Sequence, residues 1–218
     1  MERSAPPPVS EFVTTTNFPG TIRILEEEVP KVNAKVTIIT VVKNSLLGLK
    51  KTEASLKGQN YGDWLWIVVV GESSDGTNSY AQSLRSDSRV QVFDDSEPGI
   101  YQAMNLGMNF VDTEYVWFMN GGDVFVDDES LGYAIRTADE KKASILMGRY
   151  LAGGMARRPL TIRKGVSTIS KIEFAFNRRL GCHQAMLFSS QAVKNANGYD
   201  TSYSLCADFD LKIGRAHV

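Results

Sequence analysis

Apolar runs alternate with amphipathic segments along the middle of the chain. Three runs are continuous and rich in β-branched or aromatic residues, which is typical of buried strands: residues 36–42, 64–70 and 115–119. A shorter strand is predicted at residues 89–93. Helical spacing of the apolar positions between these runs predicts helices over residues 46–57, 78–84 and 100–110.

Strands and helices in this strict alternation predict an α/β fold. We expect a doubly wound, mostly parallel central sheet flanked by helices, similar in outline to a Rossmann fold. The pattern then loosens to a helix at 128–141, a strand at 144–151 and an apolar stretch at 185–188. Right-handed crossovers place the loops after strands one, two and four at the same edge of the sheet. Asn44, Asp75 and Asp123 are therefore expected to converge there.

Composition and charge narrow the possible functions. With 218 residues and 43% hydrophobic content, the chain fits one domain with an ordinary core. A formal charge of -1, with acidic and basic residues interspersed, argues against an electrostatic nucleic-acid binder. No apolar stretch reaches the length of a membrane span, and residues 1–12 lack the hydrophobic segment of a secretory signal. The sequence thus predicts a cytoplasmic protein, with a proline-containing extension at 1–34 and a domain at 35–212.

The residues that follow the run at 115–119 point to metal or phosphate chemistry. Asn120, Gly121 and Gly122 end the run and let the backbone approach a ligand, and Asp123 supplies a carboxylate. Open α/β sheets bind ligands at the carboxyl ends of their strands, where an aspartate can hold a hard cation and, through it, phosphate oxygens. Asp123 also fits an ordinary turn or helix cap. The sequence leaves both interpretations open.

Other polar groups are less specific. The turn at 71–77 has small residues that let backbone amides approach a phosphate or a base, although such residues fill ordinary turns too. A lone histidine such as His183 is more often structural than a ligand or a base. Asp208 and Asp210 are two residues apart and cannot share a helix face. The sequence contains neither a glycine-rich dinucleotide fingerprint after the first strand nor a Walker A lysine motif.

Six segments in the right order give the chain a family resemblance. They are VTIITVVKN from Val36, WIVVVGESSDGT from Trp66, EPGIYQAMNLGM from Glu97, FMNGGD from Phe118, GCHQAMLF from Gly181 and CADFDLKI from Cys206. Together they make the chain resemble glycosyltransferase family 2, whose members have the GT-A fold. The resemblance covers residues 36–212 and lies with the branch found in bacterial exopolysaccharide (colanic-acid-like) and O-antigen gene clusters.

The resemblance implies transfer of a sugar, with inversion, from a nucleotide-diphosphate donor to a hydroxyl of a saccharide or a lipid-linked saccharide. It places this reaction in cell-surface polysaccharide synthesis, in the cytoplasm at the inner face of the plasma membrane, with peripheral association. Asp123 matches a position that holds Mg²⁺ or Mn²⁺, and Asp208 matches the base that deprotonates the acceptor. His183 and Gln184 match the acceptor side. The positions matched to donor binding are Thr40, Val42, Asn44, Glu72, Asp75, Asn105 and Asn120.

Departures from the family pattern keep alternatives open. Val70 stands where an aspartate commonly contacts the base, Gln102 replaces another aspartate, and Asn120 stands where a first metal-binding aspartate would be. A non-catalytic nucleotide-sugar-binding domain is therefore the second hypothesis. A nucleotidyltransferase is the third, and it is disfavoured because the loop at 43–46 has no glycine.

The last six residues suggest an artefact. Residues 213–218 are the translation of ATC GGA AGA GCA CAC GTC, a string that lies within a widely used short-read sequencing adapter. We therefore expect the natural gene to continue past Lys212 and exclude this tail from fold reasoning. The catalytic domain is accordingly expected to be truncated, with a fold that is incomplete at its C-terminal end.

Overall fold

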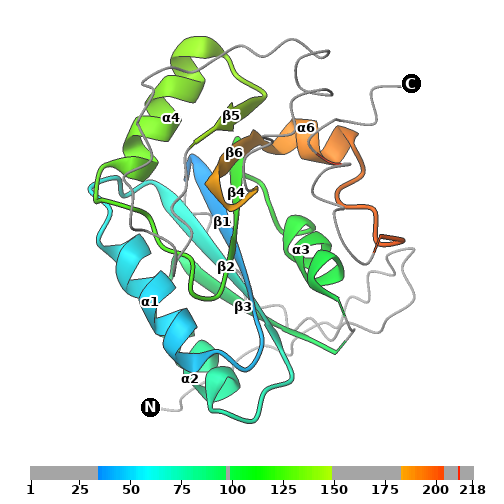
Figure 1. Cartoon of the computed structure of the whole chain (residues 1–218). Coiled ribbons are helices and arrows are strands. Elements are labelled where there is room, and N and C mark those ends of the chain that lie inside the picture. The colour runs from blue at the N-terminus through cyan, green and yellow to red at the C-terminus, as the bar shows by residue number, and fades with distance from the viewer. Residues whose placement is uncertain (1–33, 97–98, 149–182, 204–210, 212–218) are drawn as a thin grey trace, which may run out of the picture.

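One six-stranded sheet organises the chain, in the order β3-β2-β1-β4-β6-β5 (Figure 1). The structure is a computed structural model that describes residues 34–96, 99–148, 183–203 and 211. The strands are β1 (Val36–Val42), β2 (Trp64–Gly71), β3 (Val90–Asp95), β4 (Tyr115–Asn120), β5 (Ile145–Met147) and β6 (Met186–Ser189). The pairs β3–β2, β2–β1 and β1–β4 are parallel, and β6 runs antiparallel to both β4 and β5.

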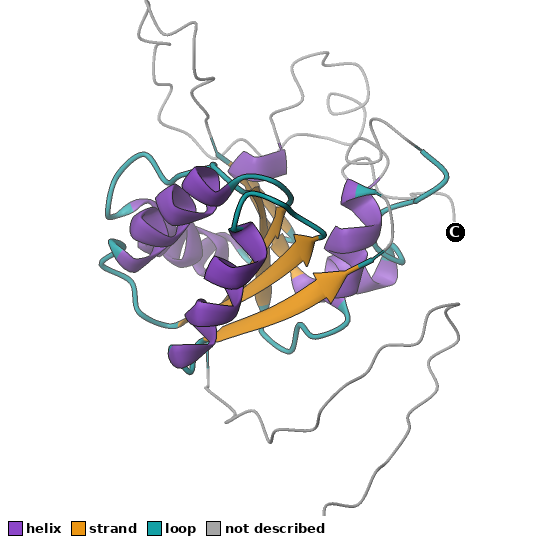
Figure 2. Ribbon diagram, turned by 90° about the horizontal axis from the view of Figure 1, so that it is seen from below, coloured by secondary structure: helices purple, strands orange, loops and turns teal. Residues whose placement is uncertain are grey.

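Helices cover both faces of this sheet (Figure 2). They are α1 (Leu46–Lys57), α2 (Thr77–Ser83), α3 (Ile100–Met108), α4 (Ser130–Lys141) and α6 (Ser190–Asn195), with short 3₁₀ segments η1 (Leu84–Ser86) and η2 (His183–Ala185). Because successive side chains of a strand point to opposite faces, the sheet separates two hydrophobic cores. One core joins α1, α2 and α4 to residues such as Trp66 and Trp117; the other joins α3 and α6 to residues such as Phe118.

The predicted doubly wound, mostly parallel sheet is confirmed. The first strand and the first helix have the predicted bounds, and the other early elements shift by one to two residues at their ends. Helix α2 begins one residue early, at Thr77, because Asp75 accepts a hydrogen bond from the Thr77 backbone N–H at 3.0 Å. The antiparallel direction of β6 and helix α6 were not predicted. Residues 149–151 of the predicted fifth strand lie outside the described residues.

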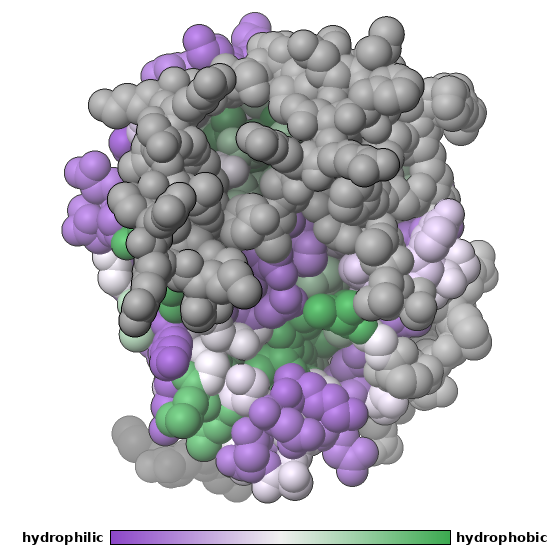
Figure 3. Space-filling model, in the orientation of Figure 1, coloured by the Kyte–Doolittle hydropathy of each residue, from purple (hydrophilic) through white to green (hydrophobic). Residues whose placement is uncertain are grey.

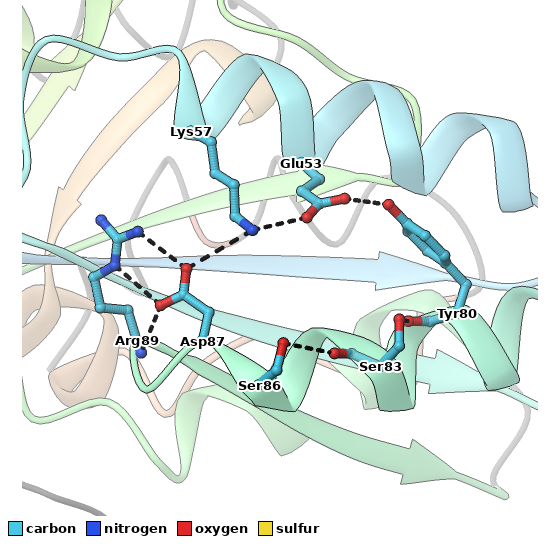
Figure 4. A network of polar contacts seen from close by, with 7 residues as sticks. All are labelled: Glu53, Lys57, Tyr80, Ser83, Ser86, Asp87 and Arg89. Atoms are coloured by element: carbon cyan, nitrogen blue, oxygen red, sulfur yellow. Dashed lines mark hydrogen bonds and ion pairs between the residues drawn. The ribbon is translucent and has the colours of Figure 1, made fainter.

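A polar network ties α1 to α2, η1 and the start of β3 (Figure 4). Glu53 accepts hydrogen bonds from the Tyr80 hydroxyl and, at 2.9 Å, from the Lys57 ammonium. Asp87 pairs with the Arg89 guanidinium at 3.0 Å and lies 3.8 Å from Lys57. The Arg89 hydrogen bonds hold the pKa of Asp87 below its usual range. This network joins the two helices to each other and to the start of β3.

Within the described residues, no helix combines the length and the apolar character that crossing a membrane requires. Residues 1–33, which make up nearly all of the expected extension, and residues 213–218, the expected artefact tail, lie outside the described part of the chain.

Candidate active site

The loops that follow β1, β2 and β4 meet at one edge of the sheet, as predicted. The Gly121 N–H continues the β4–β1 ladder by donating to the Val41 carbonyl at 2.9 Å. A Cβ on Gly121 would lie 2.5 Å from Cγ2 of Val42, so only glycine fits against the end of β1. In the lower half of Figure 3, where β1 and β2 end, hydrophobic residues (green) lie at the centre and hydrophilic residues (purple) border them.

Asp123 closes a tight turn at the end of β4. Its N–H donates to the Asn120 carbonyl at 2.9 Å, and its Oδ2 accepts from the Asn120 N–H at 2.7 Å. Gly122 supplies the left-handed conformation, with φ of 114°. The turn interpretation of Asp123 is thus correct, but it occupies one carboxylate oxygen. Among the described residues, no hydrogen bond reaches the other oxygen, Oδ1, so the turn and the ligand interpretations are compatible.

Thr52 fixes this turn from α1, and sequence reasoning missed it. Its hydroxyl donates to the Asp123 carbonyl at 2.8 Å and accepts from the Gly122 N–H at 2.9 Å. The side chain is 0% exposed. A threonine on the apolar face of a helix, between Leu49 and Leu56, was the available signal, because a buried hydroxyl needs a partner.

The donor atoms beside Asp123 fit a divalent cation. Oδ1 of Asn120 is buried and has no hydrogen-bond partner within the described residues. An orphaned amide oxygen and a carboxylate oxygen of the same turn are the kind of hard ligands that Mg²⁺ and Mn²⁺ take. No cluster of three or more His, Cys, Asp or Glu side chains suited to a metal occurs in the described ranges. The protein would therefore supply few ligands, which matches Mg²⁺ sites completed by substrate phosphates and water.

The predicted donor residues Asn44 and Asp75 lie close together, because each side chain accepts a hydrogen bond from the backbone of the other residue's loop. Oδ1 of Asn44 accepts from the Ser74 N–H at 2.9 Å, and Oδ2 of Asp75 accepts from the Leu46 N–H at 3.0 Å. Hydrogen bonds from Thr77 and from the Leu46 backbone hold the pKa of Asp75 below its ordinary value. Glu72 is exposed on the same turn.

Two other predicted donor residues, Thr40 and Val42, have buried side chains. Thr40 is 0% exposed, and its hydroxyl accepts a hydrogen bond from the Trp66 indole N–H at 2.9 Å. Val42 is buried beneath Gly121. β-Strand alternation turns both side chains toward α1 and α4, and the donor binding expected of these two residues stays a prediction.

Asn105 anchors a neighbouring segment. Its Nδ2 donates to the Tyr199 carbonyl at 2.8 Å, and its Oδ1 accepts from the Tyr199 N–H at 2.8 Å. The Tyr199 ring stacks on Tyr101, with centroids 5.2 Å apart, and meets Phe118 edge-on at 5.1 Å. The amide group predicted to contact the donor therefore holds the backbone of a buried aromatic residue.

The predicted acceptor residues lie beside this aromatic cluster. His183 is buried, and its ring lies edge-on to Tyr199 with centroids 6.3 Å apart. The Gln184 carbonyl accepts from the Trp117 indole N–H at 2.7 Å, which attaches η2 to β4. Asp208, the predicted base, lies outside the described residues.

Comparison with known proteins decides the family. The model of the family described as "Glycosyl transferase family 2" matches residues 37–194, which is well over half of the chain. The chain belongs to glycosyl transferase family 2. An uncharacterized glycosyltransferase of Mycobacterium tuberculosis (strain H37Rv) is 30% identical to it over 188 residues, which are 84% of this chain and 69% of the relative. A PGL/p-HBAD biosynthesis glycosyltransferase of the same strain is 26% identical over 163 residues, 73% of this chain and 60% of that protein.

Solved structures that superpose on this family 2 chain confirm its GT-A-like fold. Staphylococcus aureus TarS 1-349 in complex with UDP superposes with a TM-score of 0.68 at 16% identity, covering 82% of this chain and 54% of TarS 1-349. The mannosyltransferase PcManGT of Pyrobaculum calidifontis, in complex with GDP-Man and Mn²⁺, gives a TM-score of 0.62 at 14% identity, with 84% and 53% covered. The chain thus spans about half the length of both solved neighbours.

Proposed function

We propose that the chain transfers a sugar from a nucleotide-diphosphate donor to an acceptor hydroxyl, with inversion at the anomeric carbon. The observation that carries this proposal is the Asn120–Asp123 turn, which leaves one carboxylate oxygen and one buried amide oxygen unbonded within the described residues. Family membership supports glycosyl transfer. The UDP complex of TarS and the GDP-Man and Mn²⁺ complex of PcManGT support the donor class and a divalent cation.

Asp123 and Asn120 are the residues that would hold the cation. When bound, Mg²⁺ or Mn²⁺ neutralises negative charge on the departing nucleotide diphosphate. The chain's own contribution is preorganisation: the Asn120 N–H and the Thr52 hydroxyl fix the turn before any ligand arrives. Glu72 is exposed at the end of β2, and we propose that it contacts the nucleoside.

On the acceptor side, Asp208 would take the proton of the attacking hydroxyl. The acceptor oxygen forms a bond to the anomeric carbon while the bond to the diphosphate oxygen breaks, so attack from the opposite face inverts the centre. His183 and Gln184, which contact Tyr199 and Trp117, are proposed to line the acceptor path. A saccharide or lipid-linked saccharide acceptor, met at the inner membrane face, completes the proposal, and the PGL/p-HBAD relative supports a biosynthetic role.

Binding of nucleotide diphosphates tests this function. UDP, GDP and their sugar conjugates are titrated into the 218-residue chain by calorimetry, with and without Mn²⁺. We expect one nucleotide to bind at least about tenfold more tightly with Mn²⁺, which corresponds to about 1.4 kcal/mol. Asp123→Asn should remove this Mn²⁺ effect while keeping the turn, because an amide oxygen can still accept from the Asn120 N–H.

Asp112→Asn is the matched control, since this exposed aspartate precedes β4 at the opposite edge of the sheet. It should bind nucleotide and Mn²⁺ as the wild type does. Release of the nucleotide from the preferred sugar donor then measures turnover, which Asp208→Asn should abolish without loss of binding. Equal Mn²⁺ dependence in wild type and Asp123→Asn would remove Asp123 from the metal site.

A further inference from the structure

The amino terminus of α1 is capped by residues of another loop. The first N–H groups of a helix have no partner within the helix, and the N-cap Ser45 makes no side-chain capping bond. Instead, three consecutive N–H groups donate to side chains of the turn after β2. Asn44 donates to Oγ of Ser73 at 2.9 Å, Ser45 to Oγ1 of Thr77 at 3.0 Å, and Leu46 to Oδ2 of Asp75 at 3.0 Å.

Asp75 caps the next helix at the same time. Its Oδ1 accepts from the Thr77 N–H at 3.0 Å and from the Thr77 hydroxyl at 2.5 Å. A carboxylate shared by two helix amino termini is favourable, because both helix dipoles are positive there. Asn44 completes the contact from the other side: it adopts φ of 47°, and its Oδ1 accepts from the Ser74 N–H. We call Asn44, Ser45, Leu46, Ser73, Asp75 and Thr77 the loop clasp.

The clasp is connected to the Asp123 turn through α1. Gly48, less than one helical turn after Leu46, lies so close to the β4 turn that a Cβ on it would be 2.9 Å from the Gly121 carbonyl oxygen. Thr52, a further turn along α1, holds Gly122 and Asp123 by hydrogen bonds. A shift of the first turn of α1 would therefore move the residues that support Asp123.

We propose that Asp75 is a positioning residue of the transfer reaction: with Thr77 it fixes the start of α1, and through α1 the Asp123 turn, without contacting the donor. Although Asp75 is exposed, each oxygen of its carboxylate already accepts a hydrogen bond within the clasp. Thr77, its main partner, is 0% exposed and out of reach of any ligand. This inference rests on the proposed function and replaces the donor contact that the sequence predicts for Asp75.

Thr77 separates positioning from direct contact. Thr77→Val removes the hydroxyl at nearly constant volume, Thr77→Ser keeps it, and Asp75→Ala removes the carboxylate. We expect Thr77→Val and Asp75→Ala each to speed hydrogen exchange of the Ser45 and Leu46 amides about tenfold, the size of a lost helix cap. Each should also weaken Mn²⁺-dependent binding of UDP or GDP by a similar factor, and the double variant should be no weaker than either. Thr77→Ser should match the wild type in both measurements.

The outcomes distinguish this inference from the proposed function. If Asp75→Ala weakens nucleotide binding while Thr77→Val binds normally, Asp75 contacts the donor directly and the inference fails. Unchanged exchange of the Ser45 and Leu46 amides in a folded Thr77→Val chain also overturns the inference. If Thr77→Val does not fold, Asp75→Asn takes its place in the same measurements. Absence of nucleotide binding in the wild type instead contradicts the proposed function, and the amide exchange still decides whether the clasp holds α1.

Discussion

Gly121 and Val42 illustrate how single residues set the site at its smallest scale. The sequence suggests that the glycines after β4 let a ligand approach the backbone. The structure gives another reason for a glycine at position 121. This residue packs against Val42 at the end of β1, with no room for a Cβ, whereas Gly122 is needed for its positive φ. Tight packing at Gly121 is what brings the Asp123 turn down onto the sheet edge.

Gly121→Ala should therefore destabilise the protein by about 1–3 kcal/mol, as overpacking does. The same substitution in a Val42→Ala background should cost less, because Cγ2 of Val42, the nearest atom at 2.5 Å, is gone and only the 2.9 Å contact with the Cβ of residue 42 remains. Gly62→Ala is the matched control, since nothing lies within 4 Å of its added Cβ. Urea unfolding of the four variants measures these differences. Equal costs of Gly121→Ala in both backgrounds would show that Val42 is not the obstacle.

At the scale of elements, α3 organises the segment around Tyr199. Asn105 projects from the helix and bonds both polar groups of the Tyr199 backbone, which lies 94 residues away in the sequence. Tyr199 in turn connects the β4 residue Phe118 with His183 of η2. One helix side chain thus sets the position of a whole aromatic cluster.

Asn105→Ala should destabilise the chain by about 2 kcal/mol, because it leaves two buried backbone groups of Tyr199 without their partner. Near-ultraviolet circular dichroism should change too, since the stacked Tyr101 and Tyr199 rings lose their fixed geometry. Asn109 is exposed at the end of the same helix. Asn109→Ala should therefore change the free energy of unfolding by no more than about 0.5 kcal/mol and leave the near-ultraviolet spectrum unchanged. Identical losses in the two variants would exclude an anchoring role for Asn105.

At the scale of the whole molecule, sequence periodicity was sufficient for the parallel strands and for helices α1 to α4. Parallel strands are buried on both faces and read as continuous apolar runs, so β1, β2 and β4 were evident. The direction of β6 was not evident, because the sequence of a four-residue strand does not indicate which strand it pairs with. The partners of Asp75 and Thr52 escaped prediction for a related reason: their hydrogen bonds join residues 29 and about 70 positions apart. Asp208 stays a prediction.

The pH dependence of unfolding belongs to this largest scale, because Tyr80 joins α2 to α1. Its hydrogen bond to the Glu53 carboxylate, with burial and the Glu53 charge adding to it, raises the pKa of Tyr80 from 10.0 to about 12. Below pH 10 the hydroxyl is protonated in both states, and the stabilisation is complete. Between pH 10 and about 12 the unfolded chain loses this proton first, so the stabilisation falls as the pH rises.

Tyr80→Phe should therefore be less stable than the wild type by about 1 kcal/mol at pH 8, the contribution of one hydrogen bond, and this difference should shrink as the pH rises through 10 toward 12. Urea unfolding at several pH values measures it. Tyr133→Phe is the control, because that side chain is 62% exposed on α4 and its difference from the wild type should stay small throughout. A Tyr80→Phe difference that is constant up to pH 12 would mean that Glu53 does not hold the Tyr80 proton, and that α1 and α2 are joined through the remaining contacts of the network.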